Sequence, residues 1–174
     1  MTEPDRQPTL EGERVLIRPI RAEDWAEMFA AAADPLIWEV HPAHDRWQEA
    51  VFRPFFDQAV ACGGGLAILD RASGAIIGSS RYDNWRPEAD TIEIGWTFIA
   101  RSHWGGATNA EMKRLMLDHI HRYVGTVVFQ VGRDNIRSRR AMEKIGGVLV
   151  DEAVEYRTMA GKLIPHVLYA IRRP

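Results

Sequence analysis

Two adjacent glycines, Gly105 and Gly106, mark the stretch of the sequence with the clearest chemical meaning. An apolar, β-branched run ends at Ala100, and apolar residues at three- and four-residue spacing begin soon after the glycines, which predicts strand, loop and helix. A helix start offers unpaired N–H groups and the positive end of the helix dipole to an anion. Glycine has no Cβ, so a phosphate can approach its backbone closely. The pattern predicts a site for a phosphorylated ligand; an ordinary strand-to-helix turn is the alternative.

Glu93 and Gly95 lie on the strand before this loop, and strand alternation places them on the same face. The carboxylate of Glu93 could act as a general base towards an amine, directly or through water. A solvent-facing carboxylate is the alternative. Gly95 indicates either a bulge, where a backbone N–H could hold a carbonyl oxygen, or simple packing against a neighbouring strand.

Asn135 and Ser138 stand at the start of a second predicted helix. Asparagine is a favoured N-cap, and Ser138 could satisfy backbone groups nearby, but both side chains could also contact a ligand. Four arginines of this segment could meet phosphates or form a solvated helix face: Arg133, Arg137, Arg139 and Arg140.

Other reactive residue types give no pattern of a site. His119 and His121 are two residues apart on a helix and face different ways, so we expect no metal site there. We expect structural or solvent-facing roles for His41 and His44, and Cys62 is interpreted as a packed small hydrophobe. No Walker A motif or dinucleotide fingerprint is present.

The elements that must position these residues follow from hydrophobic periodicity and turn signals. The pattern predicts a strand or hairpin at 10–20, strands at 66–70, 75–82, 91–99, 126–131, 147–157 and 163–172, and helices at about 22–33, 45–61, 106–124 and 135–145. This order favours an α+β fold with a single mixed, mostly antiparallel twisted sheet of about six to seven strands and about four helices. The strands on either side of the third helix should be parallel. We expect residues 1–9 to be a flexible tail and residues 10–174 to be one domain.

Composition excludes several classes of protein. The 174 residues carry 22 basic and 24 acidic side chains, a formal charge of −2, so no global field attracts nucleic acid or an acidic membrane. The N-terminus lacks the apolar core of a signal peptide, and no apolar run is long enough for a spanning helix. One cysteine, Cys62, fits a reducing compartment, so we expect a cytoplasmic protein.

Four stretches resemble the GNAT superfamily of acyl-CoA-dependent N-acyltransferases, and more closely its RimJ/RimL-like branch of ribosomal-protein N-terminal acetyltransferases. In chain order they are Glu93–Trp96, Trp104–Glu111, Asn135–Gly147 and Arg157–Tyr169. The likeness extends from about Leu10 to Arg172. It implies a GNAT-type fold, acetyl-CoA as co-substrate, no metal, and direct transfer of acetyl to a primary amine.

The resemblance also implies roles for individual residues. Glu93 would be the base, and Asn135 would hydrogen-bond the pantetheine arm. Ser138 would lie near the thioester sulfur, at the position that has been given the role of protonating the leaving thiolate in the RimJ/RimL-like group. The implied cofactor-binding residues are Trp96, Phe98, Arg101, His103, Trp104, Gly105, Gly106, Ala107, Thr108, Asn109, Asn135 and Ser138. The chain departs from the pattern at two places: the basic position before the glycines is Ser102, with Arg101 one residue early, and Met142 replaces a tyrosine thought to protonate the leaving thiolate.

The sequence leaves the acceptor open between a protein N-terminus and a small-molecule amine. An α-amine with a pKa near ~8 is about a tenth neutral at pH 7, whereas a lysine near ~10.4 is neutral only about 0.04% of the time, which favours a weakly basic amine. The expected partners are acetyl-CoA and this amine, with no nucleic acid and no membrane. The apolar C-terminal hairpin would allow a homodimer. Met142 supports an alternative function, a CoA-binding regulatory or sensor domain with little or no turnover.

Overall fold

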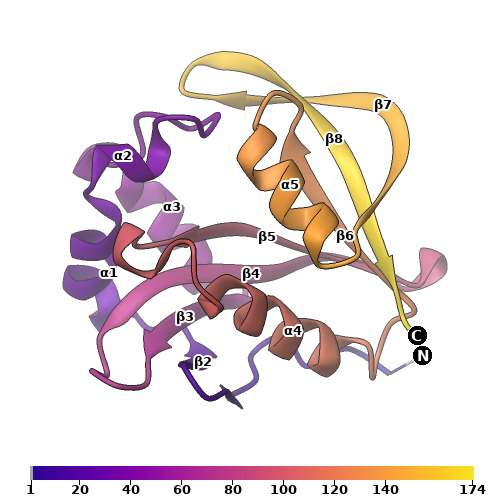
Figure 1. Cartoon of the computed structure of the whole chain (residues 1–174), viewed down its shortest axis with the longest axis horizontal. Coiled ribbons are helices and arrows are strands. Elements are labelled where there is room, and N and C mark those ends of the chain that lie inside the picture. Colours follow the sequence, from indigo (N-terminus) through magenta and orange to yellow (C-terminus); the bar gives the residue numbers. More distant parts are fainter. Residues whose placement is uncertain (1) are drawn as a thin grey trace.

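The computed structural model describes residues 2–174, except for the side chains of residues 151–156, and its framework is one eight-stranded sheet (Figure 1). The strand order is β1-β2-β3-β4-β5-β6-β8-β7. Only β5 and β6 pair in parallel; the other neighbours are antiparallel. The strands are β1 (Leu10–Glu11), β2 (Val15–Pro19), β3 (Gly65–Asp70), β4 (Ile76–Arg86), β5 (Thr91–Ile99), β6 (Thr126–Gly132), β7 (Val148–Met159) and β8 (Lys162–Arg172).

The helices cover both faces of this sheet. They are α1 (Trp25–Ala32), α2 (Pro35–Trp38), α3 (Glu49–Ala61), α4 (Thr108–Ile120) and α5 (Ile136–Lys144), with short 3-10 turns at Ala22–Asp24, Pro87–Ala89 and Arg101–His103. The core beneath α4 and α5 is mostly aliphatic, while the core beneath α1 and α3 is rich in aromatic rings. No helix in the described part of the chain is long and apolar enough to cross a bilayer.

The expected α+β fold with a mixed, mostly antiparallel sheet and one parallel pair is confirmed. The sheet has one strand more than the upper expectation, because the segment 10–20 turns at Gly12 and forms both β1 and β2. The helix count also rises by one. After the helix that was expected at about 22–33, the Asp34 side chain accepts a hydrogen bond from the Leu36 N–H (3.0 Å) and so caps the short additional helix α2, with Pro35 in its first turn.

The parallel strands β5 and β6 separate soon after they meet. Their pairing covers only Thr91–Thr126, Ile92–Val127 and Glu93–Val128, although β5 continues to Ile99 and β6 to Gly132. Beyond this point the two strands do not form a ladder with each other. The sheet is therefore open between β5 and β6 on the side nearest the start of α4.

A bulge in β5 changes which side chains face which side of the sheet. Ser79 of β4 pairs with Phe98 and Arg81 pairs with Gly95, so β5 has one residue more than β4 over this interval. The extra residue is Trp96, whose φ of 52° lies in the left-handed region that non-glycine residues seldom adopt. Of the two interpretations of Gly95, the structure therefore supports a bulge, directly beside the glycine, and not simple packing.

The carboxylate of Glu111 fastens α4 to the turn between β1 and β2. It accepts hydrogen bonds from the N–H groups of Glu13, Arg14 and Val15 at 3.1, 2.9 and 3.0 Å. Burial opposes the charge, but these three bonds outweigh it and hold the pKa of Glu111 below its usual range. A Cβ on Gly12 would lie 2.6 Å from Oε2 of Glu111, so this turn encloses the carboxylate closely.

We expect Glu111→Gln to lower the free energy of unfolding by ~1–3 kcal/mol, because an amide cannot accept three N–H bonds with both of its terminal atoms. The loss should shrink as the pH falls through the lowered pKa of Glu111, since protonation removes the same acceptor in the wild type. Denaturant unfolding at pH 7 and at acidic pH measures both effects. Glu49→Gln, an exposed change in the first turn of α3, is the control; equal stability of the two variants would contradict the assignment.

Candidate active site

A cavity of about 510 Å³ occupies the opening between β5 and β6. It is lined by residues 94–99 of β5 and by residues 129–132 of β6. These are the parts of the two strands that do not pair with each other. One end reaches the glycine loop at His103–Gly106, and another part is lined by Glu93 and Arg157. The cavity thus connects the predicted anion site with the predicted base.

The glycine loop leaves the start of α4 free for a ligand. Gly105 has a φ of +73°, and a Cβ at either Gly105 or Gly106 would meet no atom within 4 Å, so the glycines do not serve internal packing. Ala107 at the N-cap gives no side-chain hydrogen bond to the first turn. The indole Nε1 of Trp104 donates to the carbonyl of Ile99 (2.8 Å) and fixes the loop to the end of β5. This geometry suits backbone binding of an anion.

Nine of the twelve predicted cofactor residues line the cavity: Trp96, Phe98, His103, Trp104, Gly105, Gly106, Asn109, Asn135 and Ser138. The other three, Arg101, Ala107 and Thr108, are not among its lining residues. Arg101 forms an ion pair with Asp34 instead. Ala107 and Thr108 open α4, and the side chain of Thr108 is buried. Backbone atoms of this loop therefore stand closer to the cavity than the Arg101 guanidinium.

Asn135 caps α5 and also lines the cavity. Its Oδ1 accepts the Ser138 N–H at 3.2 Å as an N-cap, and both side chains also line the cavity. Of the four arginines in this segment, only Arg137 lines the cavity; its guanidinium lies 4.2 Å from the ring centre of Trp104. Met142 is buried and lines the cavity from the next turn of α5.

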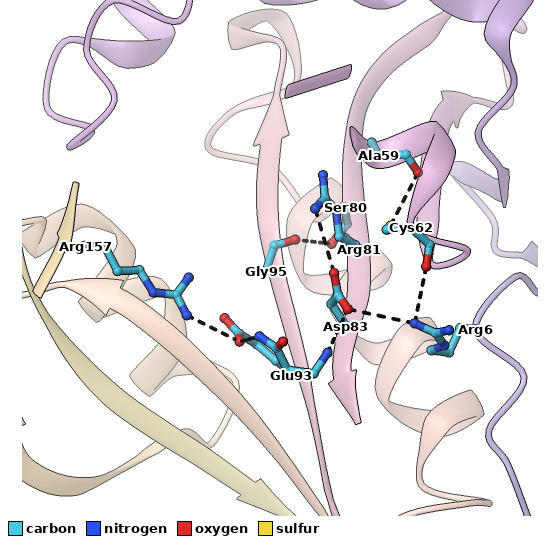
Figure 2. A network of polar contacts seen from close by, with 10 residues as sticks. Arg6, Ala59, Cys62, Ser80, Arg81, Asp83, Glu93, Gly95 and Arg157 are labelled. Carbon is cyan, nitrogen blue, oxygen red and sulfur yellow. Dashed lines mark hydrogen bonds and ion pairs between the residues drawn. The ribbon is translucent and has the colours of Figure 1, made fainter. Parts of the chain in front are cut away.

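Glu93 is buried at the point where β5 and β6 part, with 3% of its surface exposed (Figure 2). Its Oε2 accepts a hydrogen bond from Asn84 Nδ2 (2.6 Å) and lies 3.6 Å from Nη2 of Arg157, which points towards it from β7. Burial raises the pKa of Glu93, and these two partners offset only part of the rise. Both contacts use Oε2, whereas Oε1 lies on the side of Gly95, 3.5 Å from where a Cβ there would stand. Oε2 of the carboxylate is therefore held by Asn84 and Arg157, and Oε1 lies beside the bulge.

Trp96, the residue with left-handed backbone, is held between two guanidinium groups. Arg81 lies 4.7 Å and Arg157 5.9 Å from its ring centre. Arg81 is 1% exposed, and none of its three guanidinium nitrogens has a hydrogen-bond partner among the described residues; the Asp83 carboxylate lies 3.8 Å away. Cation–π contacts therefore help to keep the strained bulge in place.

The cavity wall on the side of α2 and α3 combines aromatic rings with a further cation. Arg46 lies 4.3 Å from the ring centre of Phe55 and 5.4 Å from that of Trp38, and burial lowers its pKa to about 10. His41 accepts the Ala43 N–H on Nδ1 (2.9 Å), and burial lowers the pKa of His41 to about 3. His41 is thus a neutral imidazole at pH 7, and its structural contact agrees with the role expected for it.

The most informative residue that sequence reasoning missed is Lys113. It is 6% exposed, lines the cavity from the second turn of α4, and donates from Nζ to Thr97 Oγ1 at 3.0 Å. Burial lowers the pKa of Lys113 to about 7. A signal was present in the sequence, because Lys113 lies four residues after Asn109 and three before Met116, on the inward face of the helix. Arg46, Arg157 and His166 also line the cavity, and they come from segments far apart in the chain.

Comparison with known proteins supports the same interpretation. Residues 14–148 match the family described as acetyltransferase (GNAT) domain, and no match was found among curated protein sequences. A GCN5-related N-acetyltransferase from Brucella melitensis is 22% identical with a TM-score of 0.80, over 95% of this chain and 79% of that one.

Two similar solved structures contain the cofactor or a derivative of it. The Microcin C7 self-immunity acetyltransferase MccE, in complex with acetyl-CoA and AMP, is 13% identical with a TM-score of 0.77, over 97% of this chain and 99% of that one. RimJ from Mycobacterium smegmatis, in complex with CoA-disulfide, is 20% identical with a TM-score of 0.74, over 98% and 90%. These identities show the shared fold and do not fix the RimJ/RimL branch. Because the family match covers most of the chain, and the opening between β5 and β6 is flanked by a glycine loop and a buried carboxylate, the protein belongs to the GNAT acetyltransferase family.

Proposed function

We propose that this protein transfers the acetyl group of acetyl-CoA directly to a primary amine, without a covalent enzyme intermediate. The observation that carries the proposal is the cavity between β5 and β6, which joins the start of α4 to the buried carboxylate of Glu93. A ligand in this opening can reach both an anion-binding helix start and a proton acceptor. The cofactor complexes of MccE and RimJ support the same choice of co-substrate.

The residues around the glycine loop fit the cofactor. The N–H groups at Gly105–Asn109 would hold the pyrophosphate, with the guanidinium of Arg137, which lies over the Trp104 ring, at the same part of the cavity. Asn135 and Ser138 would contact the pantetheine arm and the region of the sulfur. When bound, acetyl-CoA supplies an activated thioester carbonyl.

Glu93 is the proposed base. Its pKa, raised by burial, brings the carboxylate closer to the pKa of an α-amine than an exposed glutamate would be, which helps proton acceptance. Asn84 and Arg157 orient the carboxylate through Oε2, so that Oε1 is left for the amine or for a bridging water. A backbone N–H of the bulge beside Gly95 would polarise the carbonyl oxygen.

The acceptor proposed from the resemblance is an α-amine, either the N-terminus of a protein, as in the RimJ/RimL-like branch, or a small weakly basic amine. The single cysteine agrees with a cytoplasmic site of action. Met142 at the cavity wall supports the second candidate function, a CoA-binding sensor with little turnover. Acetyl-CoA would raise the unfolding temperature in both cases, but an acceptor screen that follows free CoA, with peptide N-termini, polyamines and aminoglycosides, would release CoA only for an enzyme.

We expect Glu93→Gln to lower kcat/KM by ~10²-fold or more, because the amide cannot accept the amine proton. In the wild type, kcat/KM should rise as the pH rises through the raised pKa of Glu93. The variant should not show this rise. Steady-state kinetics between pH 5 and 9 would measure both effects. Glu88→Gln, an exposed change just before β5, is the control; unchanged acetylation in Glu93→Gln would remove Glu93 from the reaction.

Ser138→Ala should leave the N-cap intact, since Asn135 binds the backbone N–H of Ser138 and not its hydroxyl. Loss of a hydrogen bond to a developing thiolate should reduce kcat by roughly 10- to 100-fold with little change in acetyl-CoA affinity. Arg140→Ala, an exposed change on the same helix, should match the wild type. A fall in cofactor affinity without a fall in kcat would show instead that Ser138 only binds.

A further inference from the structure

Lys113 lies on the cofactor side of the cavity, on the opposite face of β5 from Glu93. Alternation from the buried Ile92 and Ile94 places Glu93 on the face of α3, and the bulge at Trp96 returns Thr97 to the face of α4. Lys113 reaches this face from α4 and hydrogen-bonds Thr97. The ammonium group therefore lies against residues 94–99 of β5, the part that does not pair with β6, between the glycine loop and the base.

No counter-ion for Lys113 is found among the side chains that the structure describes. Its neighbours are the hydroxyl of Thr97, which is 2.8 Å from that of Ser80, and the ring of Phe129, whose centre lies 5.4 Å from Nζ. Burial is the only cause of its lowered pKa, so no charged group of the described residues contributes. A cation buried without an anion is unfavourable unless a ligand completes its environment.

The covalent structure of CoA would place its sulfur beside residues 94–99 of β5. The pyrophosphate would lie at the start of α4 and the acetyl group must reach an amine near Glu93, so the arm between them passes along the unpaired residues of β5. Of the chain's lysines, Lys144 and Lys162 are exposed, and Lys113 alone lines the cavity. Met142, at the position of the proton-donating tyrosine of many relatives, can donate nothing.

We propose that the ammonium group of Lys113 contacts the sulfur of CoA and gives it a proton as the thioester breaks. The proposal rests on the acetyl transfer proposed above. The amine nitrogen forms a bond to the thioester carbon, the carbon–sulfur bond breaks, and the electron pair stays on sulfur. One proton passes from the amine to Glu93 and one from Lys113 to sulfur. Glu93 then releases its proton to water and Lys113 takes one from water. The products are therefore the amide and the CoA thiol, with no net change in protons.

The acidity of Lys113 suits this transfer. An alkyl thiol has a pKa near ~8.5, so an ammonium group with a pKa near 7 in the empty cavity is close to it in strength, whereas an ordinary lysine near ~10.4 would hold its proton more tightly. Beside a thiolate, the attraction between the two charges raises the pKa of Lys113 and lowers that of the thiol, so the two groups can share one proton. Ser138, on the other wall, can stabilise the thiolate by a hydrogen bond, and its hydroxyl is a weaker acid than an ammonium group with a pKa near 7. The two side chains thus complement each other.

The direct test is the ionisation of CoA bound to the protein. The ultraviolet absorbance of the thiolate, with the desulfo-CoA complex as blank, should titrate at least about one pH unit lower in the wild type than in Lys113→Met, because a neighbouring cation favours the thiolate. Lys144→Met, an exposed change on α5, should titrate as the wild type does. Equal titration in the wild type and Lys113→Met would overturn the proposal.

Affinity provides a second readout that separates the sulfur from the rest of the cofactor. Above pH 8, the wild type should bind CoA roughly tenfold more tightly than desulfo-CoA, and Lys113→Met should lose this preference. Equal weakening of both ligands in the variant would place Lys113 on another part of the cofactor and overturn the contact with sulfur. If no amine is acetylated but the thiol titration shifts, the sulfur contact stands and the proposed turnover fails.

Stability of the ligand-free protein confirms that the variant is folded. Because burial lowers the pKa of Lys113, the unfolded chain binds more protons, and the wild type should gain stability relative to Lys113→Met as the pH rises from about 7 towards ~10.4. Below pH 7 the variant should have the higher unfolding temperature, since it buries no charge. A variant that is less stable than the wild type across this range would show that Lys113 has a structural role.

Discussion

The parting of β5 and β6 is the constraint on which the rest of the site depends. A sheet normally pairs its backbone groups across neighbouring strands, and an unpaired edge inside a sheet leaves N–H and C=O groups without partners. Here the pairing ends at Glu93 and Val128, so a gap opens that side chains of α4, α5 and the α2–α3 segment line but do not fill. An extended ligand with its own amides can take the place of a strand.

Burial, rather than pairing with opposite charges, is the largest influence on the pKa values of three ionisable residues that line this gap. It raises the pKa of Glu93, lowers that of Lys113 to about 7 and lowers that of His41 to about 3. Each shift moves the group towards its neutral form, which is the general effect of a site with little water. Burial thus brings the pKa values of a carboxylate and an ammonium group closer together than they are in solution. The two groups belong to opposite faces of β5.

Sequence alone could predict the parts of this site that depend on local patterns. The order of strands and helices follows from periodicity, and the glycine loop, the Asn135 cap and the alternation of Glu93 with Ile92 are read from short stretches. The bulge was indicated by Gly95, although the strained residue is its neighbour Trp96. These features are local because a few consecutive backbone angles decide them.

The remaining parts depend on contacts between distant segments. Arg157 reaches Glu93 from a strand more than sixty residues away, and Arg46 meets Phe55 and Trp38 only after α2 and α3 fold onto the sheet. Lys113 was hidden for a different reason: a lysine among inward positions of an amphipathic helix is normally assigned to the solvated face. The hydrogen bond to Thr97 in the folded chain shows that it points inward, as its helical position already indicated.

The Asp34 carboxylate has a wider consequence than the capping of a short helix. One oxygen holds the first turn of α2, which carries Trp38 into the cavity wall, and the other meets Arg101 at the entry to the glycine loop. A single side chain therefore ties the start of α2 to the 3-10 turn that precedes the glycine loop. Two segments of the cavity lining that lie more than sixty residues apart in the chain are thus held to each other at a point outside the cavity.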